Sequence, residues 1–117
     1  MATTVLIVDD HGSFRASARA LLEAGGFDVV GEATDGASAL AAAGELDPDV
    51  VLLDIHLPDV DGFAVAKRLE ADGLSAAIVL TSSRSVTSFR RRLAANPAWR
   101  FVPKSELSGD ALAALVG

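Results

Sequence analysis

Five short apolar runs, spaced along the whole chain, constrain the fold of this sequence more than any other feature. The runs are rich in Val, Leu and Ile, and three of them are continuously apolar rather than alternating with polar residues. A continuous apolar run is typical of a strand that is covered on both faces, as in a parallel sheet. The pattern predicts strands at residues 5–8, 27–30, 50–53, 77–80 and 101–102.

The segments between and after these runs have the spacing of amphipathic helices. Gly25-Gly26 is typical of the end of a first helix, and Asn96-Pro97 of the end of a fourth. Strand and helix therefore alternate five times, which predicts one three-layer α/β domain over residues 1–117 with a doubly wound, parallel five-stranded sheet. The residues that mark the five helical segments are Phe14, Ala18, Leu21 and Leu22; Leu40, Ala41 and Ala43; Phe63, Ala66 and Leu69; Val86, Phe89 and Leu93; and Leu107, Ala111, Leu112 and Leu115.

Charge and composition exclude several classes of protein. The net charge of −6 argues against nucleic-acid binding by this domain alone, because phosphate contacts require clustered Lys and Arg. The chain has no cysteine, so disulfides and thiolate metal sites are excluded. Its apolar runs are too short to span a bilayer, and its first residues lack the pattern of a signal peptide. We expect a cytoplasmic protein without membrane contact.

The charges are distributed unevenly along the chain. Acidic residues concentrate in residues 1–72 and basic residues in residues 73–117. This polarity indicates either solvated faces of opposite sign, or an acidic cation site in the first half and a partner-facing surface in the second. The run Arg90-Arg91-Arg92 has the same two interpretations, of which a solvated helix face is favoured over a docking patch.

Polar side chains follow four of the five predicted strands. Asp9-Asp10 follows the first, Asp54 the third, Thr81 the fourth, and Lys104 comes shortly after the fifth. The carboxyl ends of parallel strands meet at one edge of an open sheet, where ligands bind. We therefore expect three carboxylates, a hydroxyl and an ammonium to converge there.

Such a set of groups is suited to phosphoryl transfer. Close carboxylates repel each other, and Mg²⁺, which prefers oxygen ligands, relieves that repulsion. A carboxylate beside Mg²⁺, Lys and a hydroxyl can act as a nucleophile and form an aspartyl phosphate. Taken singly, each acid and Thr81 would more often cap a helix, and Lys104 would be solvated, but their joint placement favours a site. His11 and His56 lack a third ligand for a transition metal, which favours solvated or capping roles.

Four segments, in this order and spacing, resemble the receiver domains of response regulators in the CheY-like superfamily. They are residues 5–11 (VLIVDDH), 49–62 (DVVLLDIHLPDVDG), 78–81 (IVLT) and 101–104 (FVPK). The opening VDDH and the ending FVPKSEL are most similar to the NarL/LuxR-type subfamily. The resemblance implies a flavodoxin-like fold with strand order 2-1-3-4-5.

The resemblance also implies a role for each matching site residue. Asp54 would be the phosphoacceptor, and Mg²⁺ would bind directly to Asp54 and Asp10, through water to Asp9, and to the backbone carbonyl of His56. The remaining implied roles are Thr81 as a hydrogen-bond donor to the phosphoryl group, Lys104 as its ion-pair partner, and Phe101 as an aromatic switch coupled to Thr81.

The partners follow from the same resemblance. A sensor histidine kinase would donate the phosphoryl group, and the surface of the fourth helix, fifth strand and fifth helix would control an output domain or partner, with homodimerisation through that surface as a further possibility. The output would be transcription regulation. NarL/LuxR-type proteins carry a DNA-binding domain after the receiver, and we expect none within this chain.

The sequence departs from the family at two places near the fifth strand. Ser105 follows Lys104, where many receivers have Pro, and residues 96–100 (NPAWR) replace a small turn that often contains Gly. We expect an altered output surface at these positions.

Three alternatives compete with a phosphorylated receiver. A degenerate receiver would act by protein contact without phosphorylation. A phosphatase of the haloacid dehalogenase kind would need a second Asp at the position of His56, and turnover of a phosphate ester would reveal it. A flavodoxin needs a Ser/Thr/Gly-rich phosphate loop, whereas Asp9 and Asp10 would repel the phosphate of FMN.

Overall fold

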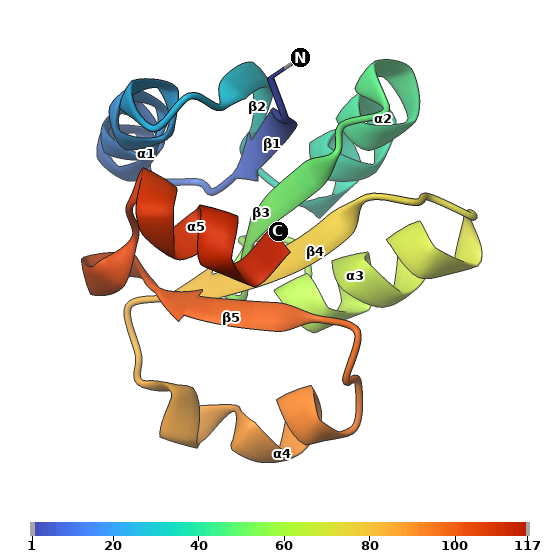
Figure 1. Ribbon diagram of the computed structural model, residues 1–117. Coiled ribbons are helices and arrows are strands. Elements are labelled where there is room, and N and C mark those ends of the chain that lie inside the picture. Colours follow the sequence, from blue (N-terminus) through green and yellow to red (C-terminus); the bar gives the residue numbers. More distant parts are fainter. Residues whose placement is uncertain (1, 117) are drawn as a thin grey trace.

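The architecture, seen in a computed structural model that describes residues 2–116, is an alternation of strands and helices (Figure 1). Each predicted strand is present, although most extend a residue or more beyond the predicted bounds. The strands are β1 (Thr4–Val8), β2 (Asp28–Ala33), β3 (Val50–Asp54), β4 (Ala77–Ser82) and β5 (Arg100–Pro103). The helices are α1 (Gly12–Ala24), α2 (Gly36–Leu46), α3 (Gly62–Ala71), α4 (Arg90–Ala94) and α5 (Gly109–Val116), with single 3₁₀ turns at Val86–Ser88 and Lys104–Glu106.

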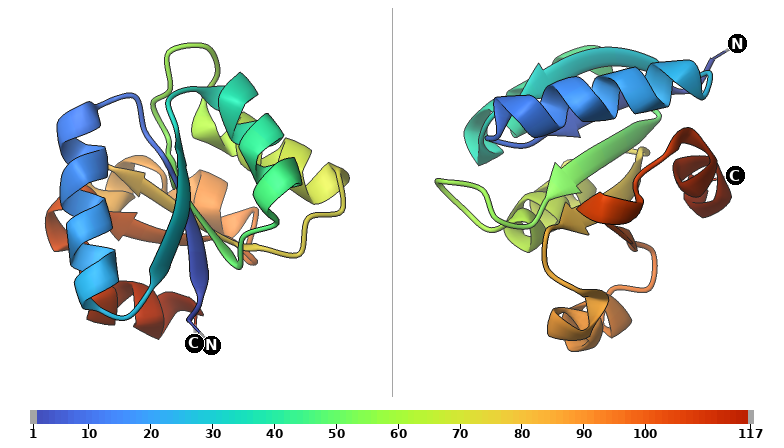
Figure 2. Two further views of the ribbon diagram at one scale, coloured as in Figure 1. Left: turned by 90° about the horizontal axis from the view of Figure 1, so that it is seen from above. Right: turned by 90° about the vertical axis from the view of Figure 1, so that its left-hand side faces the viewer.

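The five strands form one parallel sheet in the order β2-β1-β3-β4-β5, which confirms the expected order and fold class. Helices α1 and α5 cover one face of the sheet, and α2, α3 and α4 cover the other (Figure 2). β1 lies between β2 and β3, so the direction of winding reverses there. This reversal opens a crevice at the carboxyl ends of β1 and β3, where such sheets bind ligands.

The continuous apolar runs are explained by two cores, one on each face of the sheet. In β1, Leu6 and Val8 point into the core beneath α2, α3 and α4, whereas Val5 and Ile7 point into the core beneath α1 and α5. All four side chains are buried, because successive residues of a strand face opposite sides and both sides are covered.

Two predicted helix faces were wrong at single positions. Leu21 is 44% exposed, since the adjacent Leu22 is fully buried beneath α1 and neighbouring helical residues point about 100° apart. Val86 is 40% exposed, because it belongs to a separate 3₁₀ turn and not to α4. The predicted end of α1 is confirmed, with Gly26 at a φ of +90°. Within residues 2–116, no helix is long and apolar enough to cross a membrane.

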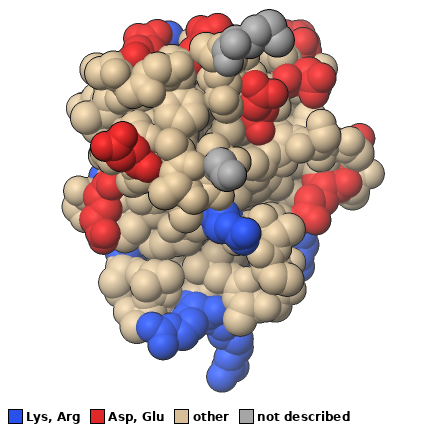
Figure 3. Space-filling view, viewed as in Figure 1, with Lys and Arg blue, Asp and Glu red and all other residues tan. Residues whose placement is uncertain are grey.

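Charge is segregated on the molecular surface, as the uneven sequence distribution suggests. In Figure 3, Lys and Arg gather over the part of the face that α4 occupies in Figure 1, whereas Asp and Glu dominate the upper part of that face. Arg92 of α4 is not simply solvated: its guanidinium lies 2.7 Å from Asp61 Oδ2 and 3.9 Å from the centroid of the Phe63 ring. This contact ties α4 to the start of α3.

Candidate functional site

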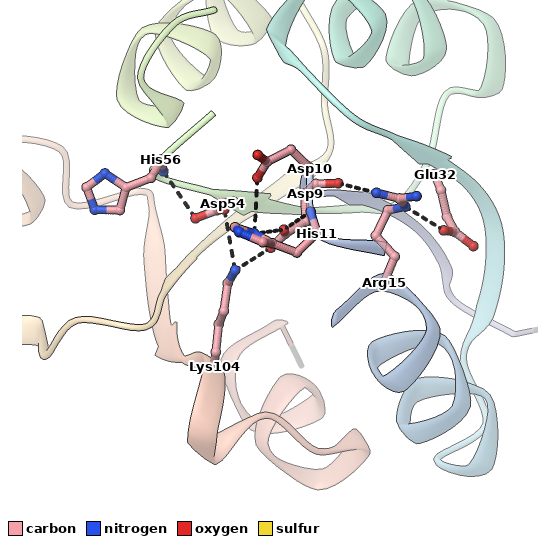
Figure 4. A network of polar contacts seen from close by, with 8 residues as sticks. All are labelled: Asp9, Asp10, His11, Arg15, Glu32, Asp54, His56 and Lys104. Atoms are coloured by element: carbon pink, nitrogen blue, oxygen red, sulfur yellow. Dashed lines mark hydrogen bonds and ion pairs between the residues drawn. The ribbon is translucent and has the colours of Figure 1, made fainter. Parts of the chain in front are cut away.

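Polar residues at the ends of β1, β3 and β5 meet at the carboxyl edge of the sheet (Figure 4). Asp9 directly follows β1, Asp54 is the last residue of β3, and Lys104 directly follows β5. Asp54 is paired in register with Thr81 of the neighbouring strand β4, so Thr81 lies at the same edge as Asp54. The fold thus brings these residues to one edge from positions far apart in the sequence.

Three carboxylates and one imidazole form the centre of the site. Asp9 is 0% exposed and Asp54 is 2% exposed, whereas Asp10 and His11 lie at the surface. One ligand atom from each of these four residues lies within 4.8 Å of the others. Two buried carboxylates at this separation are costly when both are ionised, and a nearby cation or protonation of one of them lowers that cost.

Lys104 supplies a cation to both buried carboxylates. Its Nζ lies 2.6 Å from Asp9 Oδ2 and 3.4 Å from Asp54 Oδ2. The ammonium also lies 4.5 Å from the centroid of the Phe14 ring of α1, so its stem is sheltered from solvent. One ammonium is shared between two carboxylates and neutralises them only in part.

The pKa of Asp54 is raised from its ordinary value of 3.8, first by burial and next by the nearby charge of Asp9. Two contacts act in the opposite direction: the backbone N–H of His56, which donates to Asp54 Oδ1 at 3.1 Å, and the ammonium of Lys104. Burial and carboxylate repulsion therefore raise the pKa of Asp54 by more than these two contacts lower it.

His11 contacts the site through both its backbone and its ring. The backbone N–H donates to Asp9 Oδ1 at 2.8 Å, and the ring Nδ1 lies 3.1 Å from an oxygen of Asp9 and of Asp10. His11 occupies the N-cap position of α1, but its side chain makes no capping hydrogen bond. The side chain is 64% exposed, as expected of a solvated histidine, but it does not cap α1, and the turn after β1 directs the ring towards the carboxylates.

Thr81 and Phe101 lie next to the site on β4 and β5. The fully buried hydroxyl of Thr81 donates to the backbone carbonyl of Val102 at 2.7 Å. The ring of Phe101 is half-buried, with its centroid 5.9 Å from that of Phe89. The exposed ring of His56 lies against the same Phe89, with centroids 5.8 Å apart. Phe89 therefore contacts rings from the β3 and β5 sides of the site.

The loop that follows β3 is held by residues that sequence reasoning did not single out. Asp59 accepts hydrogen bonds from the backbone N–H groups of Gly36 and Ala37 at the start of α2. Asp61 caps α3 through the N–H of Ala64. Local sequence carries a signal for the second contact, an acid at an N-cap, but none for the first, because its partners are more than twenty residues away.

Trp99 accounts for the unusual turn before β5. The indole is 5% exposed, its ring centroid lies 6.0 Å from that of Phe63, and its N–H donates to the carboxylate of Glu70. The turn at residues 96–100 therefore anchors β5 to α3. The loop after β5 continues as a 3₁₀ turn from Lys104 to Glu106.

The donor set fits a hard divalent cation. The centre offers carboxylate oxygens, as Mg²⁺ prefers, and two of the carboxylates are adjacent in sequence. Asp9 Oδ2 is buried and accepts no well-directed hydrogen bond from the described residues, although the ammonium of Lys104 lies close to it. This oxygen therefore retains lone-pair capacity towards the centre of the cluster.

Comparison with known proteins identifies relatives over nearly the whole chain. A family model described as "Response regulator receiver domain" matches residues 5–116. BvgA of Bordetella pertussis, named as a positive transcription regulator of virulence factors, is 39% identical over 106 residues, which cover 91% of this chain and 51% of BvgA. The nitrate/nitrite response regulator protein NarP of Escherichia coli is 42% identical over 85 residues, which cover 72% of this chain and 40% of NarP.

The fold is also found among solved structures. The crystal structure of a LuxR-family two-component response regulator from Aurantimonas sp. SI85-9A1 superposes with a TM-score of 0.85 at 28% identity, covering 99% of this chain and 86% of that chain. The chain spans about half the length of the curated relatives that it matches most extensively.

Proposed function

This chain belongs to the response regulator receiver family of two-component systems, in its NarL/LuxR-like branch, and from that premise we propose that it is switched by Mg²⁺-dependent phosphorylation of Asp54. The observation that supports this most strongly is the environment of Asp54. This carboxylate is buried at the end of β3, lies 3.4 Å from Lys104, and shares a cluster with Asp9, Asp10 and His11.

In this proposal Mg²⁺ would be held by Asp10 and Asp54 directly, by Asp9 through water, and by the backbone carbonyl of His56. When bound, Mg²⁺ neutralises carboxylate charge and the charge that develops on the transferred phosphoryl group. The carboxylates of Asp9, Asp10 and Asp54 supply the oxygen atoms of the site. Asp9 is fully buried, so solvent screens its charge little.

The nucleophile is a carboxylate oxygen of Asp54, and the donor is a phosphohistidine of a sensor histidine kinase. An O–P bond forms at Asp54 while the P–N bond to the kinase imidazole breaks. The imidazole nitrogen leaves with the electron pair of the P–N bond, and the kinase histidine departs as neutral imidazole because its other ring nitrogen carries a proton. The ammonium of Lys104 and the backbone N–H of His56 favour the ionised carboxylate that attacks, against the raised pKa that burial gives Asp54.

Lys104 and Thr81 then act on the phosphoryl group. Lys104 exchanges its ion pair with Asp9 for one with a phosphoryl oxygen. Thr81 exchanges its hydrogen bond to the Val102 carbonyl for a hydrogen bond to a phosphoryl oxygen. Charge-assisted hydrogen bonds contribute about 1.5 to 3 kcal/mol each, and a shift between two states from 1:99 to 99:1 takes about 5.5 kcal/mol. Because each exchange also gives up an existing contact, only the excess of the new contacts over the lost ones drives the switch.

The switch reaches the surface through Phe101. Displacement of Thr81 opens space towards which the half-buried Phe101 ring turns, and the surface of α4, β5 and α5 changes with it. We propose that residues 1–117 form one receiver domain, regulatory rather than enzymatic, whose surface controls a transcriptional output and offers a route to homodimerisation. The naming of BvgA as a transcription regulator supports this output.

The test is phosphorylation by a small phosphodonor. The protein is incubated with acetyl phosphate and Mg²⁺, and its intact mass is recorded beside that of Asp54→Asn. The proposal expects one phosphoryl adduct that requires Mg²⁺ and that the variant lacks. A folded protein that forms no adduct would instead be a degenerate receiver that acts by protein contact, and an adduct that persists in Asp54→Asn would place the phosphoacceptor elsewhere.

A further inference from the structure

Arg15 of α1 joins the turn after β1 to the end of β2, immediately beside the acidic cluster (Figure 4). Its Nη1 donates to the backbone carbonyl of Asp9 at 2.8 Å, and its Nε donates to Glu32 Oε1 at 2.9 Å. The Arg15 side chain is 20% exposed. None of the residue roles described above uses this contact.

The backbone carbonyl of Asp9 lies just beyond the paired residues of β1 and β2, and it accepts a hydrogen bond from Arg15. The backbone N–H of Asp9 still donates to the carbonyl of Ala33 at 3.0 Å, but the register of β1 with β2 ends at Val8 and Ala33. The carbonyl of Asp9 lies beyond that register, and it accepts its hydrogen bond from the Arg15 side chain. Arg15 thus sets the orientation of the peptide plane between Asp9 and Asp10.

The orientation of this peptide plane governs where the Asp10 carboxylate lies. The Asp10 side chain is 35% exposed, and its one recorded polar contact among the described residues is with the His11 ring at 3.1 Å. A side chain with so few contacts takes its direction mainly from the backbone that carries it. In contrast, the Asp9 carboxylate is buried and is also held by the His11 N–H and by Lys104.

We infer that Arg15 is a positioning residue of the metal site, which fixes the Asp9–Asp10 peptide and thereby holds the Asp10 carboxylate in place for Mg²⁺. The inference rests on the proposed function, since it assumes that Asp10 ligates Mg²⁺. Residues that orient metal ligands in this way typically contribute about 10- to 100-fold to metal affinity.

Glu32 and Arg19 keep the Arg15 guanidinium in its place. Glu32 accepts from Arg15 through one oxygen and from Arg19 Nε through the other, at 2.8 Å. The planar guanidinium of Arg15 donates in two fixed directions, to Asp9 and to Glu32, which a single ammonium does not reproduce. Arg19 shares the same carboxylate but has no contact with the turn after β1, and it therefore provides a matched control.

The experiment measures the Mg²⁺ dissociation constant of the full chain by isothermal titration calorimetry, beside thermal unfolding in EDTA. Arg15→Met is expected to weaken Mg²⁺ binding about 10- to 100-fold. Arg19→Met, which also removes an ion pair with Glu32 and a bond to the carbonyl of Val29, is expected to change it by about twofold or less, since no ligand-orienting contact is lost. Arg15→Lys keeps the positive charge but has a single ammonium in place of the planar guanidinium. Its Mg²⁺ affinity is expected to fall between those of wild type and Arg15→Met.

The outcomes separate this inference from the proposed function. Equal Mg²⁺ affinities of Arg15→Met and Arg19→Met would overturn the positioning role while leaving Asp54 phosphorylation intact. A wild-type chain that binds no Mg²⁺ and forms no phosphoryl adduct would overturn both. If Arg15→Met fails to fold, Arg15→Lys carries the test, and an affinity equal to that of wild type would then reject the inference.

Discussion

The ammonium of Lys104 lies closer to Asp9, at 2.6 Å, than to Asp54, at 3.4 Å. The residue proposed to contact the phosphoryl group therefore makes its shorter ion pair with a carboxylate on the metal side of the site. A divalent cation at Asp9 would compete with this ammonium. Binding of Mg²⁺ would release Lys104 towards Asp54, where the phosphoryl group arrives.

Replacement of Lys104 should affect Mg²⁺ binding and phosphorylation in opposite directions. We expect Lys104→Met to bind Mg²⁺ about fivefold or more tightly, because a competing positive charge near the carboxylates is removed. Phosphorylation by acetyl phosphate should slow about a hundredfold, because a charge that stabilises the transferred group is lost.

Calorimetry measures the change in Mg²⁺ affinity, and intact-mass time courses measure the change in phosphorylation rate. Lys67→Met, on the exposed side of α3, is the control, and slower phosphorylation with weaker Mg²⁺ binding would contradict the expected competition.

The raised pKa of Asp54 predicts how stability depends on pH. The folded protein holds this proton to a higher pH than the unfolded chain does, so the free energy of unfolding falls as pH rises above the ordinary value of 3.8 through the raised pKa. Asp54→Asn removes that penalty. We expect the variant to be more stable than wild type at pH 7.5 without Mg²⁺, and the difference to shrink as pH is lowered.

Urea unfolding in EDTA, followed by the fluorescence of the buried Trp99, measures this difference between pH 7.5 and pH 4.5. Asp28→Asn, an exposed carboxylate on β2, is the control and should leave stability nearly unchanged. A variant at Asp54 that is less stable than wild type at pH 7.5 would mean that the contacts with Lys104 and His56 outweigh burial.

Loss of the Thr81 hydroxyl should affect both stability and switching. The buried hydroxyl donates to the Val102 carbonyl, so Thr81→Ala leaves that acceptor unpaired and should lower the free energy of unfolding by about 1 to 3 kcal/mol. Phosphorylation should still modify Asp54 but leave the NMR signals of the Phe101 ring unchanged. Thr81→Ser keeps the hydroxyl and should retain the Phe101 response. A normal response in Thr81→Ala would exclude Thr81 from the switch.

Gly62 should not accept even a methyl group. A Cβ at Gly62 would collide with the backbone carbonyl of Asp54 and lie 2.8 Å from the Cα of Ile55. We expect Gly62→Ala to destabilise the protein by about 1 to 3 kcal/mol and to weaken Mg²⁺ binding, since the strand end must shift. Gly44→Ala meets no heavy atom within 4 Å in α2 and should stabilise by about 0.5 to 1 kcal/mol. Urea unfolding of both variants is the measurement, and equal stabilities would contradict the packing argument.

The alternation of strands and helices and the edge that carries the site were predictable from local pattern, whereas the strand order was implied by the resemblance to receiver domains. A continuous apolar run such as residues 50–53 is stable only when both faces of a strand are covered, and covered parallel strands end at a common edge. The positions of Asp9, Asp54, Thr81 and Lys104 at that edge follow directly. Periodicity was less informative at Leu21 and Leu22, because either of two adjacent apolar residues can face the core and only packing selects one.

Sequence by itself therefore determined which elements form and which polar residues reach one edge, because both depend on residue type and spacing along the chain. Tertiary structure alone decided the contacts of the His11 ring, the hydrogen bond from Arg15 to the Asp9 carbonyl and the anchoring of Trp99 on Glu70. These contacts depend on strand register, turn geometry and side-chain rotamers. Several of them join segments that no local pattern connects, so they exist only once the two cores have packed.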